Sequence, residues 1–567
     1  MDTSKSSANS IAVLIVGAGP AGLTAALALA KNNVPIRIIE KNPVFEARAR
    51  GAGLYPRTLE VLANLGAIGP IIENGQFVNT MRAYGPNGRD VVKSWEFIEF
   101  VGDVKPDIPY PNLLWYPQEG TEVALRDALE EYGVHVELST EFIRLEQDAT
   151  GVTAHIVSHG THETVKVDWV IGADGGKSVV RKGLDSVSFL GETREESTTI
   201  VADVHVENFD RGAWHLWSNP EAGRIIMCPV YPSPRFVCFL MREEGEVPKE
   251  ILSGNLDALQ IMFNSAAGRD DIKMSKLNCI STWRPNIRMV DKFSVGRVFL
   301  VGDAAHTHPL TGGQGLNTSV QDAHNLSWKI ALVYKKLAPP SLLSTYSEER
   351  MPLIAEMLNL TKELYTSLYG KPGSASTPLA DLDTQVWQRG GKLSGLGVNC
   401  RWSSIVIDER TVRAEGETIE AYGLPGGVLR AGDRAPDAPS LTDIADADKP
   451  ATTLFKLFGP AHHTALVFPA ADSDFKPNII DDLNSFNSFV PLVVPVLILP
   501  AGSYPSQIKA EASYRIVEDK DGYARKGYDI SGGAWVVIVR PDGVVGAIVK
   551  GREGAQKYFS SIFLALR

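Results

Sequence analysis

Near the start of the chain, an apolar run, a glycine-rich turn and a second apolar run follow one another directly. The first run, IAVLIV from Ile11, predicts a buried strand, and AGLTAALALA after the turn predicts a helix. The segment VPIRIIE then predicts a second strand. A strand, a helix and a strand in this order form a βαβ unit, whose two strands pair in parallel. The chain is therefore expected to begin with an α/β fold.

The turn between strand and helix has the spacing GxGxxG, which suits a dinucleotide. Gly17 permits the tight turn, Gly19 lets a pyrophosphate approach the backbone, and Gly22 lets the helix pack on the strand. A carboxylate ends the second strand, where it can bind an unphosphorylated ribose, as in FAD or NAD. An ordinary glycine turn is the alternative. The predicted cofactor contacts in this segment are Gly17, Gly19, Pro20, Ala21, Gly22, Glu40 and Lys41.

Two later motifs also place an aspartate just after an apolar strand. RVFLV is followed by Gly302 and Asp303 and then by GGQGLN at 312–317. In this layout Asp303 would bind a ribitol or ribose hydroxyl, and the glycines would offer backbone N–H groups to a flavin ring or phosphate. The strand in VDWVIGADG ends at Asp174 in the same manner. The simpler alternative is an aspartate that caps a helix beside a plain glycine turn.

Composition excludes several classes of protein. The 567 residues are enough for two or three domains, and 44 % hydrophobic with 22 % charged residues is ordinary globular usage. A net charge of -11 argues against nucleic acid as a partner. The apolar runs are broken by glycine or proline, so no membrane span is expected. Four cysteines without a CxxC predict free thiols in a cytoplasmic protein, and His306 with His308 lacks further ligands, so no metal site is predicted.

Turn and linker composition divides the chain. Short strands between about Leu184 and Trp283 predict an antiparallel sheet, and the residues from about Thr318 to Leu368 predict one long helical stretch. Gly370 to Pro378, GKPGSASTP, has linker composition. From about Gly423 further strand signals predict a smaller α/β domain, with a hairpin turn at Pro541-Asp542-Gly543.

GAGPAG, GADGGKS and GDAAH, in this order, resemble the three fingerprints of the flavoprotein aromatic hydroxylases, the class A FAD monooxygenases. The chain is most similar to the phenol hydroxylase-like branch, over essentially residues 11 to 567. The resemblance implies an α/β fold with three parts: a Rossmann-like FAD-binding domain, an antiparallel β-sheet substrate domain (p-hydroxybenzoate hydroxylase-like) and a C-terminal thioredoxin-like domain. The expected ranges are 11–369 for the FAD-binding domain with the substrate domain interleaved at about 75–115 and 184–290, 370–422 for a connecting segment, and 423–567 for the thioredoxin-like domain. Since every flavin motif precedes residue 370, a chain that ends near Gly370 is expected to bind flavin without the C-terminal region.

The resemblance also assigns residues. Arg50 would reach the diphosphate or ribityl region of FAD, and Gln118 would touch the flavin side. Asp174 belongs to the fingerprint associated with both FAD and NADPH. The remaining expected flavin contacts are Gly302, Asp303, Pro309, Gly313, Gln314, Gly315, Leu316 and Asn317. Trp217, Met227 and Trp283 are substrate candidates, although core packing is the preferred explanation for each.

The implied reaction is hydroxylation of a phenolic ring with NADPH and O2 through a C4a-hydroperoxyflavin. Oxidative decarboxylation of a hydroxybenzoate-type acid, ring epoxidation and Baeyer-Villiger oxidation in secondary metabolism stay open as alternatives. A flavin-binding regulator is the alternative outside enzymes. The expected partners are a small aromatic substrate and dioxygen, and a homodimer is left open.

One position departs from the family. Phenol hydroxylase relatives carry an aspartate two residues before the leucine of the segment RGAGL, where it draws the proton from the substrate hydroxyl, and this chain has Ala52 there. A methyl group cannot accept a proton. Either a tyrosine, a histidine or an ordered water elsewhere takes this role, or the substrate is activated by a second electron-donating group. The catalytic base is therefore not identified by the sequence.

Overall fold

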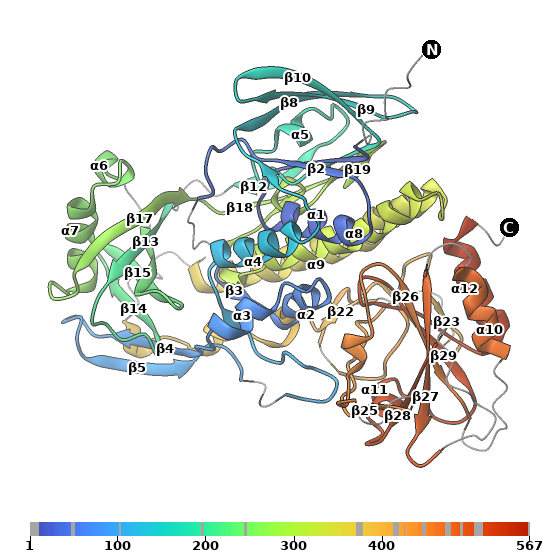
Figure 1. Ribbon diagram of the computed structural model, residues 1–567. Coiled ribbons are helices and arrows are strands. Elements are labelled where there is room, and N and C mark those ends of the chain that lie inside the picture. The colour runs from blue at the N-terminus through green and yellow to red at the C-terminus, as the bar shows by residue number, and fades with distance from the viewer. Residues whose placement is uncertain are drawn as a thin grey trace.

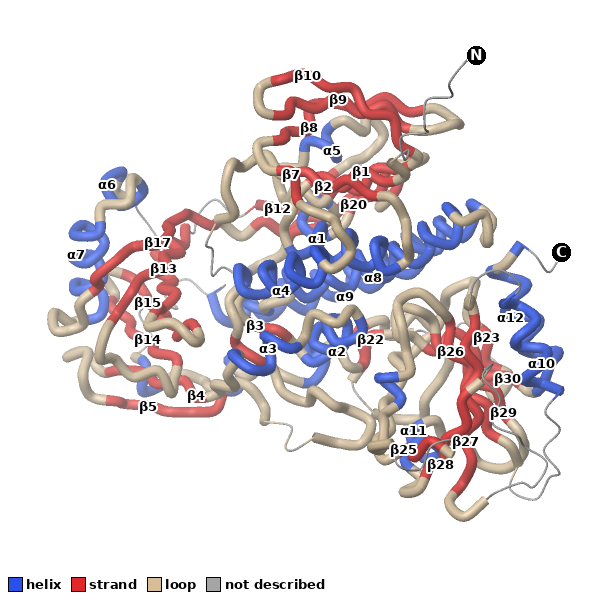
Figure 2. Tube along the Cα trace, in the orientation of Figure 1, coloured by secondary structure: helices blue, strands red, loops and turns tan. Residues whose placement is uncertain are grey.

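The computed structural model describes residues 11–46, 51–100, 102, 104–193, 198–242, 247–369, 378–411, 419–424, 426–444, 449–470, 478–487, 491–503 and 514–564. Figure 1 shows three sheet-containing regions arranged around a pair of long central helices. Figure 2 shows that most strands gather in these regions and that long loops join them. None of the helices in the described ranges has the length and hydropathy of a membrane span.

The first sheet contains the predicted βαβ unit. In order across the sheet, its strands are β19 (Ser294–Val295), β20 (Val298–Leu300), β11 (Trp169–Gly172), β1 (Val13–Val16), β2 (Ile36–Ile39) and β7 (Val136–Glu137). All neighbours pair in parallel except β19 with β20. Helix α1 (Pro20–Lys31) joins β1 to β2, and Asn33 then adopts the left-handed conformation that ends it, with φ 56°.

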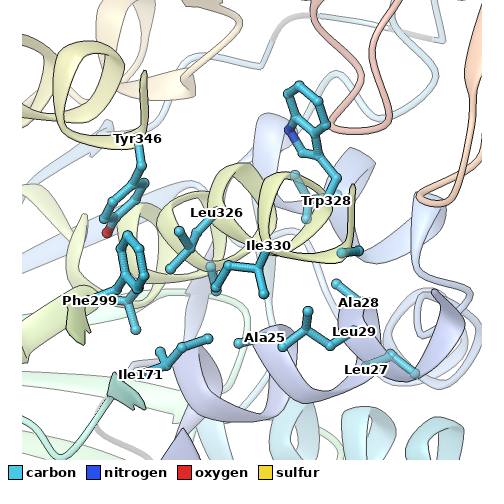
Figure 3. Packing of buried hydrophobic residues seen from close by; sticks show 14 of the residues in the cluster. Ala25, Leu27, Ala28, Leu29, Ile171, Phe299, Leu326, Trp328, Ile330 and Tyr346 are labelled. Atoms are coloured by element: carbon cyan, nitrogen blue, oxygen red, sulfur yellow. The ribbon is translucent and has the colours of Figure 1, made fainter. Parts of the chain in front are cut away.

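Two long helices brace this sheet. They are α8 (Gly315–Tyr334) and α9 (Ser344–Tyr369). The single helical stretch expected from the sequence is interrupted after Tyr334, where Lys336 adopts the left-handed conformation with φ 59°. Pro339 and Pro340, which lack a backbone N–H, follow before α9 begins. Small residues of α1, among them Ala25 and Ala28, lie opposite Ile330 of α8 and allow the two helices to pack closely (Figure 3).

A mixed sheet of seven strands forms the second region. In order, its strands are β17 (Met274–Trp283), β13 (Thr198–Val206), β16 (Arg235–Arg242), β15 (Gly223–Val230), β14 (Trp214–Asn219), β4 (Thr80–Tyr84) and β5 (Val91–Glu96). The expected antiparallel pairing is found throughout, except that β14 and β4 are parallel. Helices α6 (Lys249–Leu252) and α7 (Leu256–Ala267) cover the outer face (Figure 1).

Smaller elements lie around these two regions. The strands are β8 (Thr140–Gln147), β9 (Val152–Ser158) and β10 (Thr161–Val167) in one sheet, β12 (Phe189–Thr193), β18 (Asn286–Val290) and β21 (His306–Thr307) in another, and the pair β3 (Gly53–Leu54) and β6 (Leu114–Trp115). The helices are α2 (Pro56–Asn64), α3 (Gly69–Asn74), α4 (Gln118–Glu130) and α5 (Val179–Lys182). Helix α2 begins at Pro56 and is followed by Gly66 with φ 77°.

The C-terminal region is a third sheet. In order, its strands are β23 (Ile407–Asp408), β30 (Val545–Val549), β29 (Trp535–Val539), β26 (His463–Phe468), β27 (Val493–Pro500), β28 (Arg515–Asp519) and β25 (Leu441–Asp443). Its helices are α10 (Asn478–Asn484), α11 (Tyr523–Gly527) and α12 (Gly551–Ile562). The predicted hairpin is β29 and β30. Strand β23 belongs to the expected connecting segment, 370–422. Within that segment, residues 370–377, which make up most of the expected linker, and residues 412–418 lie outside the described residues.

Candidate active site

The three glycine motifs meet at the carboxyl end of the first sheet. Gly17 has φ 102°, and a Cβ on it would lie 2.5 Å from the carbonyl oxygen of Ala173. A Cβ on Gly302, which has φ 58°, would lie 3.3 Å from Cβ of Ala21. Because only glycine permits these approaches, the late and middle motifs both pack against the first turn. The carboxyl end of a parallel sheet is where α/β proteins bind nucleotides.

The first turn has the geometry of a pyrophosphate cradle. A Cβ on Gly19 would meet no atom within 4 Å, whereas one on Gly22 would lie 1.9 Å from the carbonyl oxygen of Gly17. Gly22 therefore closes the turn, and Gly19 leaves its outer side open. No side chain caps the N-terminus of α1, whose N–H groups stay available for an anion.

Glu40 lies beside this cradle. Its Oε2 accepts a hydrogen bond from the backbone N–H of Ala18 at 3.2 Å, and its Oε1 accepts one from Asn42 at 3.0 Å. The carboxylate is thus fixed at the edge of the turn, where the sequence expects a ribose. Lys41 is exposed next to it. These residues fit the ADP part of FAD.

Asp174 lies at the middle motif, and its carboxylate faces the protein. Its Oδ1 accepts from the Ser178 hydroxyl at 2.5 Å, and its Oδ2 accepts from the backbone of Val179 at 2.6 Å. It therefore caps α5. Arg181 of this helix donates to the carbonyl oxygens of Ala304 and Gly176, both at 2.7 Å, and so ties the middle motif to the late one.

The late motif rests on a buried ionic network. Asp303 is exposed on the single turn Gly302–Ala304, as a ligand contact would require. Beneath it, Oδ2 of Asp322 lies 2.8 Å from Nε2 of His306, and Oδ1 accepts from Arg350 at 2.7 Å. Burial alone would raise the pKa of Asp322, but its contacts with Arg350 and His306 lower it below its ordinary value. His306 thus supports the motif from within the core.

Residues 312–317, the glycine loop, follow this motif and include the first residues of α8. Gly313 has φ 60°. Asn317 donates to the carbonyl oxygens of Gly53 at 2.9 Å and Gly313 at 2.8 Å, and its Oδ1 accepts from the backbone of Tyr55 at 2.9 Å. The loop is therefore fastened to the segment that contains Ala52.

Gln118 also belongs to this group. A Cβ on Gly51 would lie 3.3 Å from Oε1 of Gln118 and 3.4 Å from Cδ1 of Leu316. The structure therefore brings Gln118 and Leu316 together around residue 51. Arg50 lies outside the described residues.

His308 is close to the first residue of α8. Its Nδ1 lies 2.7 Å from the carbonyl oxygen of Pro309, so this nitrogen carries the proton and Nε2 holds the free lone pair. A Cβ on Gly315 would lie 2.7 Å from Nε2, so glycine is needed there. Burial lowers the pKa of His308 below its ordinary value, so the ring is neutral at neutral pH.

An aromatic wall, Phe97, Trp115 and Trp214, closes the space near Ala52. The ring of Trp214 lies 4.8 Å from that of Phe97 and 4.6 Å from that of Trp115, between centroids. Ala52 and Tyr55 pack in the same apolar cluster. The indole N–H of Trp214 is buried and has no acceptor among the described residues. Sequence reasoning missed this wall.

The substrate candidates predicted from the sequence lie on opposite faces of the mixed sheet. Trp217 and Met227 are buried on the outer face, in a core that includes Phe263 of α7, and the Trp217 indole donates to Gly88. The structure does not bring them to Ala52. Trp283 packs with Leu310 on the inner face, close to the glycine loop.

A carboxylate–arginine cluster, Glu119, Asp203 and Arg235, lies at the junction of α4 and the mixed sheet. Arg235 contacts Glu119 at 2.6 Å and Asp203 at 3.4 Å. Asp203 Oδ2, Glu119 Oε2 and two nitrogens of Arg235 have no hydrogen-bond partner among the described residues. Burial raises the pKa of Asp203 above its ordinary value. These atoms can therefore form hydrogen bonds with polar groups of a ligand.

Comparisons with known proteins agree with this geometry. Residues 10–361 match the family described as FAD binding domain. The chain is 33 % identical to a flavin-dependent monooxygenase of Mycobacteroides abscessus, over 97 % of this chain and 99 % of the relative. It is 30 % identical to pentachlorophenol 4-monooxygenase of Sphingobium chlorophenolicum, over 94 % of this chain and 93 % of the relative.

Among solved structures, the fold is similar to the flavin-dependent monooxygenase PieE in complex with FAD and substrate. The TM-score is 0.80 at 22 % identity, over 98 % of this chain and 100 % of that one. It is also similar to aklavinone-11 hydroxylase in complex with FAD and aklavinone, with a TM-score of 0.76 at 22 % identity, over 97 % and 98 % of the two chains. The chain belongs to the FAD-binding-domain family and is a FAD-dependent monooxygenase of the aromatic hydroxylase type.

Proposed function

We propose that this enzyme uses NADPH and dioxygen to place one oxygen atom on a phenolic ring that lies between the glycine loop and the aromatic wall. The observation that carries the proposal is the meeting of the three glycine motifs beside the wall at Ala52. When bound, FAD supplies the redox chemistry that activates dioxygen. The protein positions the ring and excludes water.

The aromatic wall is suited to hold such a ring. Trp214 offers its buried indole N–H to a phenolic oxygen, and Phe97 and Trp115 offer ring faces. On the cofactor side, Gly17, Gly19, Pro20, Ala21, Gly22, Glu40 and Lys41 would hold the ADP part of FAD. Asp303 would hold the ribitol, and the glycine loop, Pro309 and Gln118 would hold the ring system.

Proton removal from the phenol needs a base other than Ala52. Burial raises the pKa of Tyr55 to about 12, so this hydroxyl stays protonated and donates to Gly312 at 3.2 Å. His308 is neutral and has its lone pair on Nε2 beside Gly315. Nε2 of His308 is therefore the proton acceptor that we assign to this site.

NADPH is assigned to a groove of about 480 Å³ behind the middle motif. Its lining includes Arg181, Lys182 and Arg288. Two of these side chains are held in place, since Arg181 donates to backbone carbonyls and Arg288 donates to Phe189. Cationic side chains at a groove beside the flavin motifs suit the phosphates of the coenzyme.

The carboxylate–arginine cluster favours hydroxylation of a neutral phenol over decarboxylation of an acid. The one guanidinium, Arg235, is paired with Glu119, and burial raises the pKa of Asp203 above its ordinary value, so the cluster has no excess positive charge to bind a substrate carboxylate. Oδ2 of Asp203 and Oε2 of Glu119 can instead accept hydrogen bonds from hydroxyl groups of a neutral phenol.

We also propose that residues 423–567 form a thioredoxin-like domain. Strands β26 and β27 are parallel with α10 between them in the chain, and the antiparallel pair β29 and β30 precedes α12. These features are typical of that fold. The ranges 11–369 and 370–422 remain the proposed FAD-binding part and connecting segment.

The direct test is substrate-stimulated oxidation of NADPH by flavin-loaded enzyme, screened with phenols and hydroxybenzoates. Product mass and released carbon dioxide are read in the same assays. Hydroxylation predicts a product one oxygen atom heavier without carbon dioxide. Release of carbon dioxide would favour decarboxylation, and no stimulation by any aromatic compound would favour a regulator.

A further inference from the structure

Tyr422 brings the connecting segment into contact with the glycine loop. It lies in β24 (Tyr422–Gly423), and its hydroxyl donates to Oε1 of Gln314 at 2.6 Å. Tyr422 is 0 % exposed and Gln314 is 1 % exposed. Burial raises the pKa of Tyr422 well above its ordinary value, so the hydroxyl stays protonated and can only donate to the amide oxygen.

The amide of Gln314 has a second set of partners. Its Nε2 donates to the carbonyl oxygen of Gly312 at 3.2 Å and to that of Leu393 at 3.1 Å. The amide oxygen thus bonds the connecting segment, and the amide nitrogen bonds both that segment and the loop. With Tyr422 in place, the two ends of the amide cannot exchange without breaking these hydrogen bonds.

Tyr422 is itself fixed from two directions. Its backbone N–H donates to Oε2 of Glu356 on α9 at 3.1 Å. Strand β24 also pairs with β22 (Gly397–Val398), with Tyr422 opposite Val398. The position of the hydroxyl therefore depends on α9 and on the fold of the connecting segment, and it is independent of the glycine loop.

We propose that Tyr422 is a positioning residue for the flavin. It holds Gln314 in the orientation that presents the backbone of Gly313 and Gly315 to the flavin ring. The inference rests on the proposed function of the glycine loop. It gives the connecting segment a part in catalysis that a linker would not have. Loss of the hydroxyl leaves the apolar packing of the ring intact but removes the donor to Oε1 of Gln314, so the amide is held only by the hydrogen bonds of its Nε2 and the loop is less firmly fixed.

The test compares Tyr422→Phe with a matched control, Tyr528→Phe. Tyr528 is also 0 % exposed, and its hydroxyl donates to the carbonyl oxygen of Pro436 at 2.8 Å, in the C-terminal region. Both variants lose one buried tyrosine hydroxyl bond, so their stabilities should change alike. FAD content, the visible spectrum of the bound flavin, and hydrogen peroxide formed per NADPH are measured for each, with resorcinol and other simple phenols as probes.

We expect Tyr422→Phe to retain FAD, to shift the flavin spectrum and to release most of the activated oxygen as hydrogen peroxide, so that product per NADPH falls by about tenfold, since small misplacement of reacting groups is costly. Tyr528→Phe should match the wild type in both readouts. Gln314→Met should reproduce the change from the loop side, and the double variant should add little to either single one. Gln314→Met also serves as the test if Tyr422→Phe does not fold.

Wild-type spectrum and coupling in both Tyr422→Phe and Gln314→Met would overturn the inference. So would equal changes in Tyr422→Phe and Tyr528→Phe, because the effect would then be general destabilisation. Failure of the proposed function is recognised separately, since the wild type would then show no phenol-stimulated NADPH oxidation. The flavin spectra still test the position of the loop in that case.

Discussion

The guanidinium of Arg540 contacts both carboxylate oxygens of Glu349, with NH1–Oε1 at 2.7 Å and NH2–Oε2 at 2.9 Å. Arg540 is in the turn of the C-terminal hairpin, and Glu349 is on α9. Lys329 of α8 donates to the same carboxylate at 2.8 Å. All three side chains are buried, so the ionic contact between the C-terminal sheet and the central helices is shielded from water.

Removing one partner of this group should destabilise the whole protein. We expect Arg540→Leu to lower the free energy of unfolding by about 3 to 5 kcal/mol, because a buried carboxylate loses a charged partner. Chemical denaturation measures this. Arg552→Leu, which removes an exposed arginine paired with Asp482, is the control and should change stability by less than about 1 kcal/mol. Equal stabilities for the two variants would contradict the assignment.

The contact between Glu349 and Arg540 also makes the stability of the protein depend on pH. Burial alone would raise the pKa of Glu349, but Arg540 and Lys329 lower it below its ordinary value. A carboxylate whose pKa is depressed by folding stabilises the protein above its unfolded pKa, and this contribution is lost as pH falls toward the folded pKa. The wild type should therefore lose stability on acidification, and Glu349→Gln should lose less over the same range.

FAD affinity should depend on Asp303. The exposed carboxylate is free to accept a ribitol hydroxyl, and such a charge-assisted hydrogen bond contributes about 1.5 to 3 kcal/mol. Asp303→Ala should weaken FAD by roughly ten- to a hundredfold in a flavin titration. Asp127→Ala, an exposed carboxylate on α4, should leave the affinity unchanged. An unaltered affinity in Asp303→Ala would remove the ribitol assignment.

Two tryptophans of one strand should behave differently. Trp214→Phe should raise KM for phenols by roughly two- to tenfold, because it removes an indole contact worth about 0.5 to 1.5 kcal/mol from the aromatic wall. Trp217→Phe should lower the midpoint of thermal unfolding and leave KM unchanged, since its indole lies in the outer core. Steady-state kinetics beside thermal melts separate the two. A change in KM in Trp217→Phe without one in Trp214→Phe would contradict the faces of the sheet assigned to the two side chains.

Ala52→Asp should not raise turnover. Ala52 packs with Tyr55 in an apolar cluster, where a carboxylate is costly to bury, and we assign the role of proton acceptor to His308. His308→Asn, in contrast, should lower kcat by about 10² or more. Initial rates at equal FAD content measure both. A gain of roughly tenfold in Ala52→Asp would show that a base is missing from the site.

Local patterns predicted the parts of this fold that depend on local chemistry. The βαβ unit and the hairpin turn at Asp542 follow from strand and turn residues, and both are found. The alternation of side chains along WHLW also contained a signal that was not used. Trp214 and Trp217 are an odd number of residues apart, so they must face opposite sides of the sheet.

Contacts between distant segments could not be predicted in this way. The bonds from Tyr422 to Gln314 and from Arg540 to Glu349 join residues whose spacing follows no period. They also argue against the expectation that residues up to 369 bind flavin alone. Without the residues after 369, Glu349 would lose its contact with Arg540 and keep only Lys329. Gln314 would lose its hydrogen bond from Tyr422.

The central claim is tested most directly with isotopically labelled dioxygen. Flavin-loaded enzyme is incubated with NADPH and a phenol that stimulates NADPH oxidation, and the product is examined by mass spectrometry. Monooxygenation predicts a hydroxylated product that carries one labelled oxygen atom, formed in step with NADPH consumption. NADPH oxidation that yields only labelled hydrogen peroxide, with every phenol recovered unchanged, would contradict it.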